Sequence, residues 1–186
     1  MASFLLRPDE SMLLVIDVQE RLHKVMESEM KDLSVKNTII LLEVARVYGI
    51  PLVLTEQYPR GLGKTIDALE VYLRETPHHE KLHFSCYRDD SIRSVLDAHT
   101  RNTVIVAGIE THVCVLQTVL DLCEAGYRVF VAGDAVSSRR ASDRIMALDL
   151  MARAGALVCS TETISFMLME KAGTDTFKQL SVLFKE

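Results

Sequence analysis

The sequence lacks the features that mark membrane, disulfide-bonded and nucleic-acid-binding proteins. No apolar run reaches the roughly 18 residues of a membrane span, and charged residues interrupt the apolar stretch near the N-terminus, so we expect neither a membrane anchor nor a secretory leader. The four cysteines form no Cys-x-x-Cys pair, which favours reduced thiols in a cytoplasmic protein. The formal net charge is −5 without a basic stripe, so neither nucleic acid nor membrane is an expected partner.

The sequence alternates between buried strands and helices over one predicted domain, residues 1–186. Apolar runs rich in Val and Ile predict strands at 11–19, 50–56, 102–109, 127–134 and 156–161, and a weaker strand is expected at 78–85. Helical stretches lie at 32–49, 114–126 and 141–155, each ending on a glycine, and a short helix is expected at 174–185. This pattern predicts a three-layer α/β/α sandwich with a central, mainly parallel six-stranded sheet, Rossmann-like in class.

Polar side chains follow several of these strands, at the edge where open α/β sheets place their functional groups. Asp17 follows the first strand and residues 55–58 follow the second. Lys81 lies in or beside the third, Cys114 comes shortly after the fourth, and Asp134 follows the fifth. An acid, a lysine and a cysteine are therefore expected at one edge of the sheet.

Together these three residues suit nucleophilic catalysis. In the first turn of a helix, free N–H groups and the helix dipole would favour the Cys114 thiolate, and Lys81 would lower the thiol pKa further. Asp17 would accept the proton. Each residue alone has a commoner structural explanation, because a free cysteine usually fills a core, an aspartate often caps a turn, and a lysine is mostly solvated.

Three motifs carry a resemblance to a known family. "LLVIDVQ", "EKLHFSCY" and "VAGIETHVCVLQTVLDLCEAGYRVFVAGDAVSSR" resemble the isochorismatase-like cysteine hydrolases, from residue 12 to about residue 180. "TEQYPRGLG" resembles the branch of isochorismatase-domain-containing proteins whose substrate is unassigned. The resemblance implies a catalytic triad of Asp17, Lys81 and Cys114 and a homo-oligomeric assembly. It also implies a cis peptide between Ile109 and Glu110 that points the Glu110 and Cys114 N–H groups into an oxyanion hole. Because a carboxylate would oppose the charge of the oxyanion, we expect the Glu110 side chain to point away and take no part.

Neither a metal nor another cofactor is expected. The nicotinamidases of this superfamily hold a metal through histidines after the second strand, and "TEQYPRGLG" contains none. "RGLGKT" ends like a P-loop, but the first glycine of that motif would fall at Tyr58. The candidate pocket residues are Gln19, Gln57, Tyr58, Phe84 and Tyr87.

These observations predict a metal-independent hydrolase of a small molecule, with Cys114 as nucleophile and an amide, a related C–N bond or an isochorismate-like ether as the bond cleaved. The alternative is a binding or scaffold protein that retains the hydrolase fold without turnover. Reactivity of Cys114 that depends on Asp17 and Lys81 separates the two, because a cysteine that only fills space responds to neither neighbour.

Overall fold

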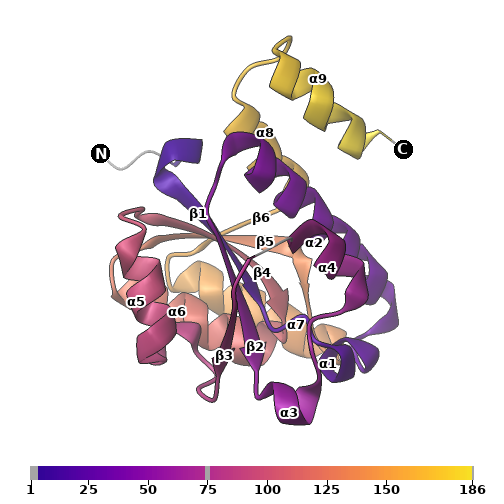
Figure 1. Ribbon diagram of the computed structural model, residues 1–186, viewed down its shortest axis with the longest axis vertical. Coiled ribbons are helices and arrows are strands. Elements are labelled where there is room, and N and C mark those ends of the chain that lie inside the picture. The colour runs from indigo at the N-terminus through magenta and orange to yellow at the C-terminus, as the bar shows by residue number, and fades with distance from the viewer. Residues whose placement is uncertain (1–3, 74–75, 186) are drawn as a thin grey trace.

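The computed structural model of the protein describes residues 4–73 and 76–185; residues 1–3, 74–75 and 186 of the predicted domain lie outside this range. Six strands form one sheet in the order β3-β2-β1-β4-β5-β6, and all neighbours are parallel (Figure 1). The strands are β1 (Ser11–Ile16), β2 (Leu52–Gln57), β3 (His78–Lys81), β4 (Thr103–Ile109), β5 (Arg128–Ser137) and β6 (Leu157–Cys159). The predicted six-stranded α/β fold is confirmed, and its strand order reverses between β1 and β4.

Helices cover both faces of the sheet (Figure 1). One face carries α2 (Ser28–Tyr48), α4 (Asp67–Leu73), α8 (Thr161–Met169) and α9 (Asp175–Ser181), and the other carries α5 (Asp90–Ala98), α6 (Leu116–Glu124) and α7 (Ala141–Arg153). The short helices α1 (Glu20–Lys24) and α3 (Pro59–Leu62) follow β1 and β2. In the described part of the chain, no helix has the length and apolar character that crossing a membrane requires.

β1 shows why the sheet is buried on both faces. Met12, Leu14 and Ile16 pack into the core under α5, α6 and α7, whereas Leu13 and Val15 pack into the core under α2 and α8. Successive side chains of a strand point to opposite faces, so a continuous apolar run requires helices on both sides.

β5 extends further than predicted, to Ser137, with a register shift against β4. Asp134, which was expected beyond the end of the strand, lies within it. Its carboxylate accepts hydrogen bonds from the Thr161 backbone N–H at 2.7 Å and from the Thr161 hydroxyl at 2.8 Å. Asp134 therefore anchors the first residue of α8 instead of joining a site at the sheet edge.

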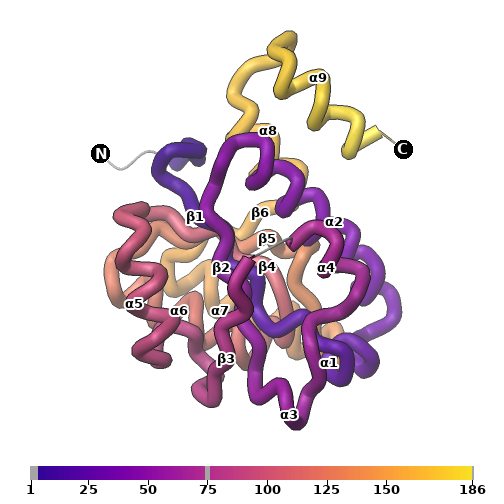
Figure 2. The backbone as a smooth tube through the Cα atoms, in the orientation of Figure 1, coloured from indigo at the N-terminus to yellow at the C-terminus, as the bar shows by residue number. Residues whose placement is uncertain are grey.

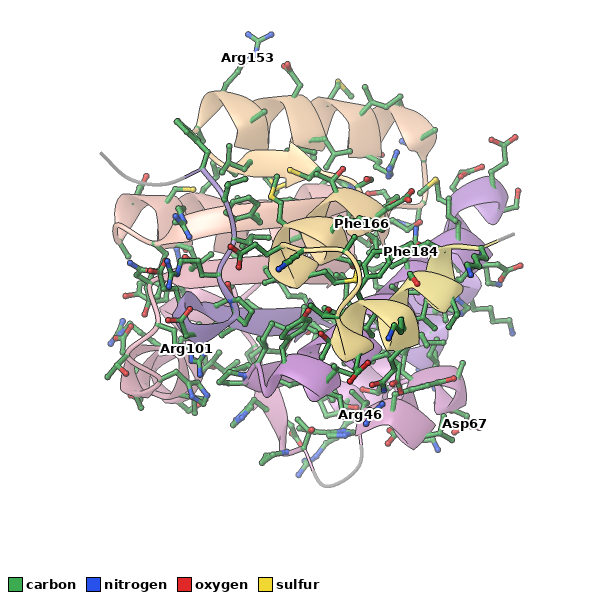
Figure 3. All side chains as sticks on the ribbon, turned by 90° about the horizontal axis from the view of Figure 1, so that it is seen from above. Arg46, Asp67, Arg101, Arg153, Phe166 and Phe184 are labelled. Carbon is green, nitrogen blue, oxygen red and sulfur yellow. The ribbon has the colours of Figure 1, made fainter. Side chains whose placement is uncertain are left out.

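The C-terminal segment packs against α8, at the end of the molecule opposite α3 (Figure 2). Phe166 of α8 meets Phe184 edge to face, with ring centroids 5.6 Å apart (Figure 3). The predicted helix at 174–185 is confirmed as α9 followed by a short 3-10 turn, Val182–Phe184. Because α3 follows the carboxyl end of β2, this segment lies away from the carboxyl edge of the sheet.

Gly108 allows the ends of β1 and β4 to meet. Its φ is +126°, and a Cβ added there would lie 2.1 Å from the Ile16 carbonyl oxygen. Only glycine tolerates both that backbone conformation and that approach. Since Asp17 follows Ile16 directly, this contact fixes where Asp17 leaves the sheet.

Gly108→Ala is expected to lower the free energy of unfolding by about 2–3 kcal/mol, because the added methyl group forces the two strands apart. Urea denaturation measures the loss. Gly49→Ala is the matched control: φ there is +63°, and no described atom beyond the adjacent residues lies within 4 Å of the added Cβ. Only the left-handed backbone then costs energy, about 1 kcal/mol. Equal losses in the two variants would contradict the close-approach explanation.

Candidate active site

Asp17 and Lys81 form a buried ion pair at the carboxyl edge of the sheet. Asp17 follows β1 and Lys81 ends β3, with β2 between these strands. Lys81 Nζ lies 2.6 Å from Asp17 Oδ2, and both side chains are fully buried. Because removing two charges from water is costly, such a pair persists only where further hydrogen bonds satisfy both partners.

Oxygen atoms surround the Lys81 ammonium group. Besides Asp17 it donates to Gln57 Oε1 at 2.7 Å and lies within hydrogen-bonding distance of the Phe84 carbonyl at 3.1 Å and the His83 carbonyl at 3.3 Å. Burial acts to lower the pKa of Lys81, but the adjacent Asp17 carboxylate opposes it, and the pKa lies above its ordinary value. Lys81 is therefore a fixed cation with an acceptor for each of its three protons.

Thr55 forms a hydrogen bond to the second carboxylate oxygen of Asp17. Its hydroxyl donates to Asp17 Oδ1 at 2.7 Å, and its oxygen lies 3.7 Å from the sulfur of Cys86. Both Thr55 and Cys86 are fully buried. The sequence predicted Thr55 at this edge but gave it no role. A polar residue in a buried strand was the signal that could have identified it. Cys86 was not predicted at this site.

Cys114 lies in a π-helical turn, Thr111–Val115, that precedes α6, so the predicted continuous helix over 114–126 is corrected. Turns of this kind often occur at functional sites. Cys114 is 5% exposed, and the Asp17 carboxylate is near enough to raise the pKa of its thiol. The structure thus brings Asp17, Lys81 and Cys114 together from three different segments.

The predicted low pKa of Cys114 is wrong. Burial raises the pKa of this thiol above its ordinary value, the Asp17 carboxylate raises it further, and Lys81 opposes them only in part. Desolvation and a neighbouring negative charge both disfavour the thiolate. The resting pair is therefore a neutral thiol beside a carboxylate able to accept its proton.

The turn before Cys114 begins with a cis peptide bond between Ile109 and Glu110. The Glu110 carbonyl accepts hydrogen bonds from the N–H groups of Val113 at 3.1 Å and Val115 at 3.2 Å, which closes the turn. The Glu110 carboxylate accepts from Arg139 Nε at 3.0 Å and from the Arg139 backbone N–H at 3.3 Å. Arg139 thus engages the Glu110 side chain.

Tyr58 lines a cavity of about 430 Å³ that reaches Lys81. Tyr58 itself is 52% exposed. The cavity is also lined by Pro59, Arg60, Glu80, Lys81, Leu82, His83 and Asp89. Its walls come from α3, the end of β3 and the segment before α5. Asp17 and Cys114 are not among the described residues that line it, and the Lys81 side chain is fully buried.

Gln19 and Gln57, both predicted as pocket residues, are buried and use their amides within the protein. Gln19 Nε2 donates to the carbonyls of Gln57 at 3.0 Å and Gly63 at 2.7 Å, and its Oε1 accepts from the Gln57 N–H at 2.8 Å. Gln57 Nε2 donates to the Leu82 carbonyl at 2.9 Å. These glutamines hold the segment around α3 to the sheet, and Gln57 also binds Lys81.

Phe84 and Tyr87 follow Lys81 but take different places. Phe84 is 52% exposed and contributes its carbonyl to Lys81. Tyr87 packs edge to face on Tyr127, with centroids 5.8 Å apart, and its hydroxyl donates to Asp97 at 3.3 Å. The 3-10 turn Cys86–Arg88 carries Tyr87 to a separate cavity, so Tyr87 is not part of the candidate site.

A comparison with known families identifies the chain. The family model described as Isochorismatase domain matches residues 11–163. The chain belongs to the isochorismatase family. The resemblance carried by the sequence motifs is confirmed, and the matched segment contains Asp17, Lys81 and Cys114.

Known isochorismatase-family proteins and related structures align over nearly the whole chain. Isochorismatase family protein 1A of Dictyostelium discoideum is 35% identical and covers 97% of this chain and 89% of its own. A structure described as MAR1 ribonuclease from Caenorhabditis elegans is 36% identical, with a TM-score of 0.89 over 96% of this chain and 91% of that one. The YcaC gene product of Escherichia coli, described as an octameric hydrolase of unknown specificity, shares the fold at 24% identity, with a TM-score of 0.90 over 99% and 91%.

The histidines near the site of this isochorismatase-family chain have protein partners of their own. His78 Nδ1 lies 3.2 Å from Glu56 Oε1, and His83 Nδ1 lies 3.9 Å from Asp89 Oδ2. Within residues 4–73 and 76–185, no three His, Cys, Asp or Glu side chains gather in a way that would hold a metal ion.

Proposed function

We propose that the protein hydrolyses a C–N bond of a small molecule, an amide or a related compound, with Cys114 as the nucleophile. The observation that carries the proposal is the fully buried Asp17–Lys81 pair, 2.6 Å apart, with the buried Cys114 thiol near enough to feel both charges. Burying two charges and a thiol together contributes little to stability, and such groups cluster at functional sites.

In the first step, the Cys114 sulfur attacks the substrate carbonyl carbon. The S–C bond forms as the thiol proton passes to Asp17 and the carbonyl electrons move onto oxygen. Lys81 stays charged and stabilises the negative charge that moves between sulfur and carboxylate. The N–H groups of Glu110 and Cys114 are the proposed donors to the oxyanion.

In the second step, the carbonyl reforms and the C–N bond breaks. Asp17 returns the proton to the leaving nitrogen, which departs as a neutral amine or ammonia and leaves a thioester on Cys114. Asp17 then takes a proton from a water molecule as the water oxygen attacks the thioester carbon. The C–S bond breaks, Asp17 returns the proton to sulfur, and a carboxylic acid is released. One water is consumed, and no other reactant is needed.

This chemistry is proposed to proceed without a metal, because Asp17 moves the proton and Lys81 supplies the positive charge. The cavity of about 430 Å³ beside Lys81 suits a small substrate. The octameric assembly described for the E. coli relative supports a homo-oligomer for this chain as well.

Acrylamide tests the proposal, because it is a small amide whose β-carbon accepts a thiol without a leaving group. We expect one acrylamide per chain by intact mass, located on Cys114 by peptide mapping, and no adduct in Cys114→Ser. Cys123→Ser is the matched control, since Cys123 lies on α6 with a pKa raised by burial alone. Its adduct yield should equal that of the parent, with or without prior dialysis against a chelator.

Adduct formation that a chelator abolishes and zinc or manganese restores would contradict the metal-free proposal. Labelling spread over several cysteines would favour the alternative of a silent binding protein.

The ribonuclease description of the C. elegans relative makes RNA cleavage the rival activity. We expect no cleavage of a mixed single-stranded RNA, because the net charge of −5 opposes a phosphate backbone; cleavage lost in Cys114→Ser would replace the amide proposal.

A further inference from the structure

Both oxygens of the Asp17 carboxylate are held by buried donors. Lys81 Nζ donates to Oδ2 at 2.6 Å, and the Thr55 hydroxyl donates to Oδ1 at 2.7 Å. Lys81 belongs to the proposed triad, whereas Thr55 has no role in the chemistry described so far. A hydrogen bond to a buried, ionised carboxylate is stronger than one between neutral groups, so Thr55 strongly affects how readily Asp17 accepts a proton.

The direction of the Thr55 hydroxyl follows from its single proton. An ionised carboxylate only accepts, so the Thr55 proton points to Asp17. The sulfur of Cys86, 3.7 Å from the Thr55 oxygen, must then be the donor in that contact. Burial raises the pKa of Cys86 to about 11, so this thiol keeps the proton it donates.

Cys86 is itself fixed relative to the nucleophile. Its backbone N–H donates to the Thr118 hydroxyl at 2.9 Å, and Thr118 lies on α6, the helix that continues the turn of Cys114. A chain of hydrogen bonds therefore runs from α6 through Cys86 and Thr55 to Asp17. All four of these residues are fully buried.

We propose that Thr55 is a positioning residue that orients Asp17 and limits how strongly it holds the proton of Cys114, and that Cys86 fixes the direction of the Thr55 hydroxyl. This inference rests on the proposed function, because the proton affinity of Asp17 matters only if Asp17 is the base for Cys114. The Thr55 bond stabilises the ionised carboxylate. It thereby favours the neutral thiol at rest and lets Asp17 release the proton to the leaving group.

The proposal predicts a faster reaction of Cys114 with iodoacetamide when the Thr55 hydroxyl is removed. Without it Asp17 is a stronger base, and the pair spends more time as carboxylic acid and thiolate. For a hydrogen bond to a charged group, we expect Thr55→Val to raise the labelling rate about 10- to 100-fold. Thr55→Ser keeps the hydroxyl and should restore the parent rate.

Quantitative peptide mapping of iodoacetamide labelling at several pH values tests this. Thr55→Val should act only through the carboxylate, so Asp17→Asn/Thr55→Val should label at the rate of Asp17→Asn alone. Labelling of Cys123 in the same digest reports on packing and should not change. A parallel rise at Cys123, or a rise that persists in the Asn background, would assign the effect to loosened packing and overturn the proposal.

Cys86→Ala tests the outer part of the chain. It should raise the Cys114 labelling rate in the same direction as Thr55→Val but by less, because the Thr55 hydroxyl remains. It should add nothing in the Thr55→Val background. An unchanged rate in Cys86→Ala would overturn the role of Cys86 and leave that of Thr55 standing.

The variants also separate this inference from the function on which it rests. If Asp17→Asn changes neither the rate nor the pH dependence of Cys114 labelling, Asp17 is not its base and the proposed function fails. If Asp17→Asn changes them and Thr55→Val does not, only the positioning role fails.

Discussion

Replacing Asp17 by Asn is expected to make Cys114 more reactive while removing catalysis. In the proposed mechanism the thiol proton of the parent protein passes to Asp17 and stays within the pair, so the iodoacetamide labelling rate should be nearly constant between about pH 6 and about pH 8. In Asp17→Asn the proton must go to water. The pKa of Cys114 then falls below its parent value, because the carboxylate that raised it is gone while the Lys81 cation remains.

The labelling rate of Asp17→Asn should accordingly rise about tenfold per pH unit until the thiol is titrated, and exceed the parent rate at neutral pH. Hydrolysis should move in the opposite direction. Asp17→Asn lacks the group that accepts and returns the proton. Its rate of ammonia release from the best substrate in a panel of small primary amides should fall about 10²- to 10⁴-fold. Labelling by peptide mapping and ammonia release by a coupled assay measure the two effects on one preparation.

Asp149→Asn is the control for a lost carboxylate. Asp149 forms an exposed helical ion pair with Arg153, 2.8 Å apart on α7, and its replacement should change neither the labelling profile nor hydrolysis. A parent protein whose labelling already rises with pH as steeply as that of Asp17→Asn would show that no proton passes to Asp17. The three-residue mechanism would then be wrong.

The parts of the fold that were predictable are those where local sequence and tertiary environment agree. β1 and β4 are continuous apolar runs because both faces are covered, and that pattern is visible in the sequence. β3 consists of "HHEK", which has no apolar residue, and is a strand because β2 pairs with it. The helices that the structure adds to the predicted ones are α1, α3, α4, α5 and α8. α8 is mostly apolar, and periodicity alone does not separate such a stretch from a buried strand.

The grouping of the acid, the lysine and the cysteine at one edge of the sheet was predictable, whereas their hydrogen bonds and the place of Tyr87 were not. Asp17, Lys81 and Cys114 follow from their positions at strand ends, whereas the Thr55 bond to Asp17 depends on how β1 and β2 pair. The error in the pKa of Cys114 has the same origin. A helix start is visible in the sequence, but the burial that raises this pKa comes from the rest of the fold.

Lys81→Met is expected to cause the largest loss of stability among these variants. The methionine fills most of the space but removes the cation 2.6 Å from Asp17, which leaves a fully buried carboxylate with Thr55 as its remaining donor. Removing one partner of a buried pair typically costs about 3–5 kcal/mol. Urea denaturation at neutral pH should show this loss in the free energy of unfolding.

The double variant Asp17→Asn/Lys81→Met decides whether charge is the cause. With both charges gone, the greater part of the stability should return, because the penalty belongs to the unpaired carboxylate and not to the altered shape.

Lys64→Met is the matched control. The Lys64–Asp67 pair is similarly close at 2.7 Å, but its side chains are 59% and 84% exposed, so the free energy of unfolding should change little. A double variant as unstable as Lys81→Met would mean that packing around the lysine stem, and not the ion pair, holds this edge of the sheet together. If Asp17→Asn/Lys81→Met regains its stability but forms no acrylamide adduct, the ion pair is needed for the chemistry and not for folding.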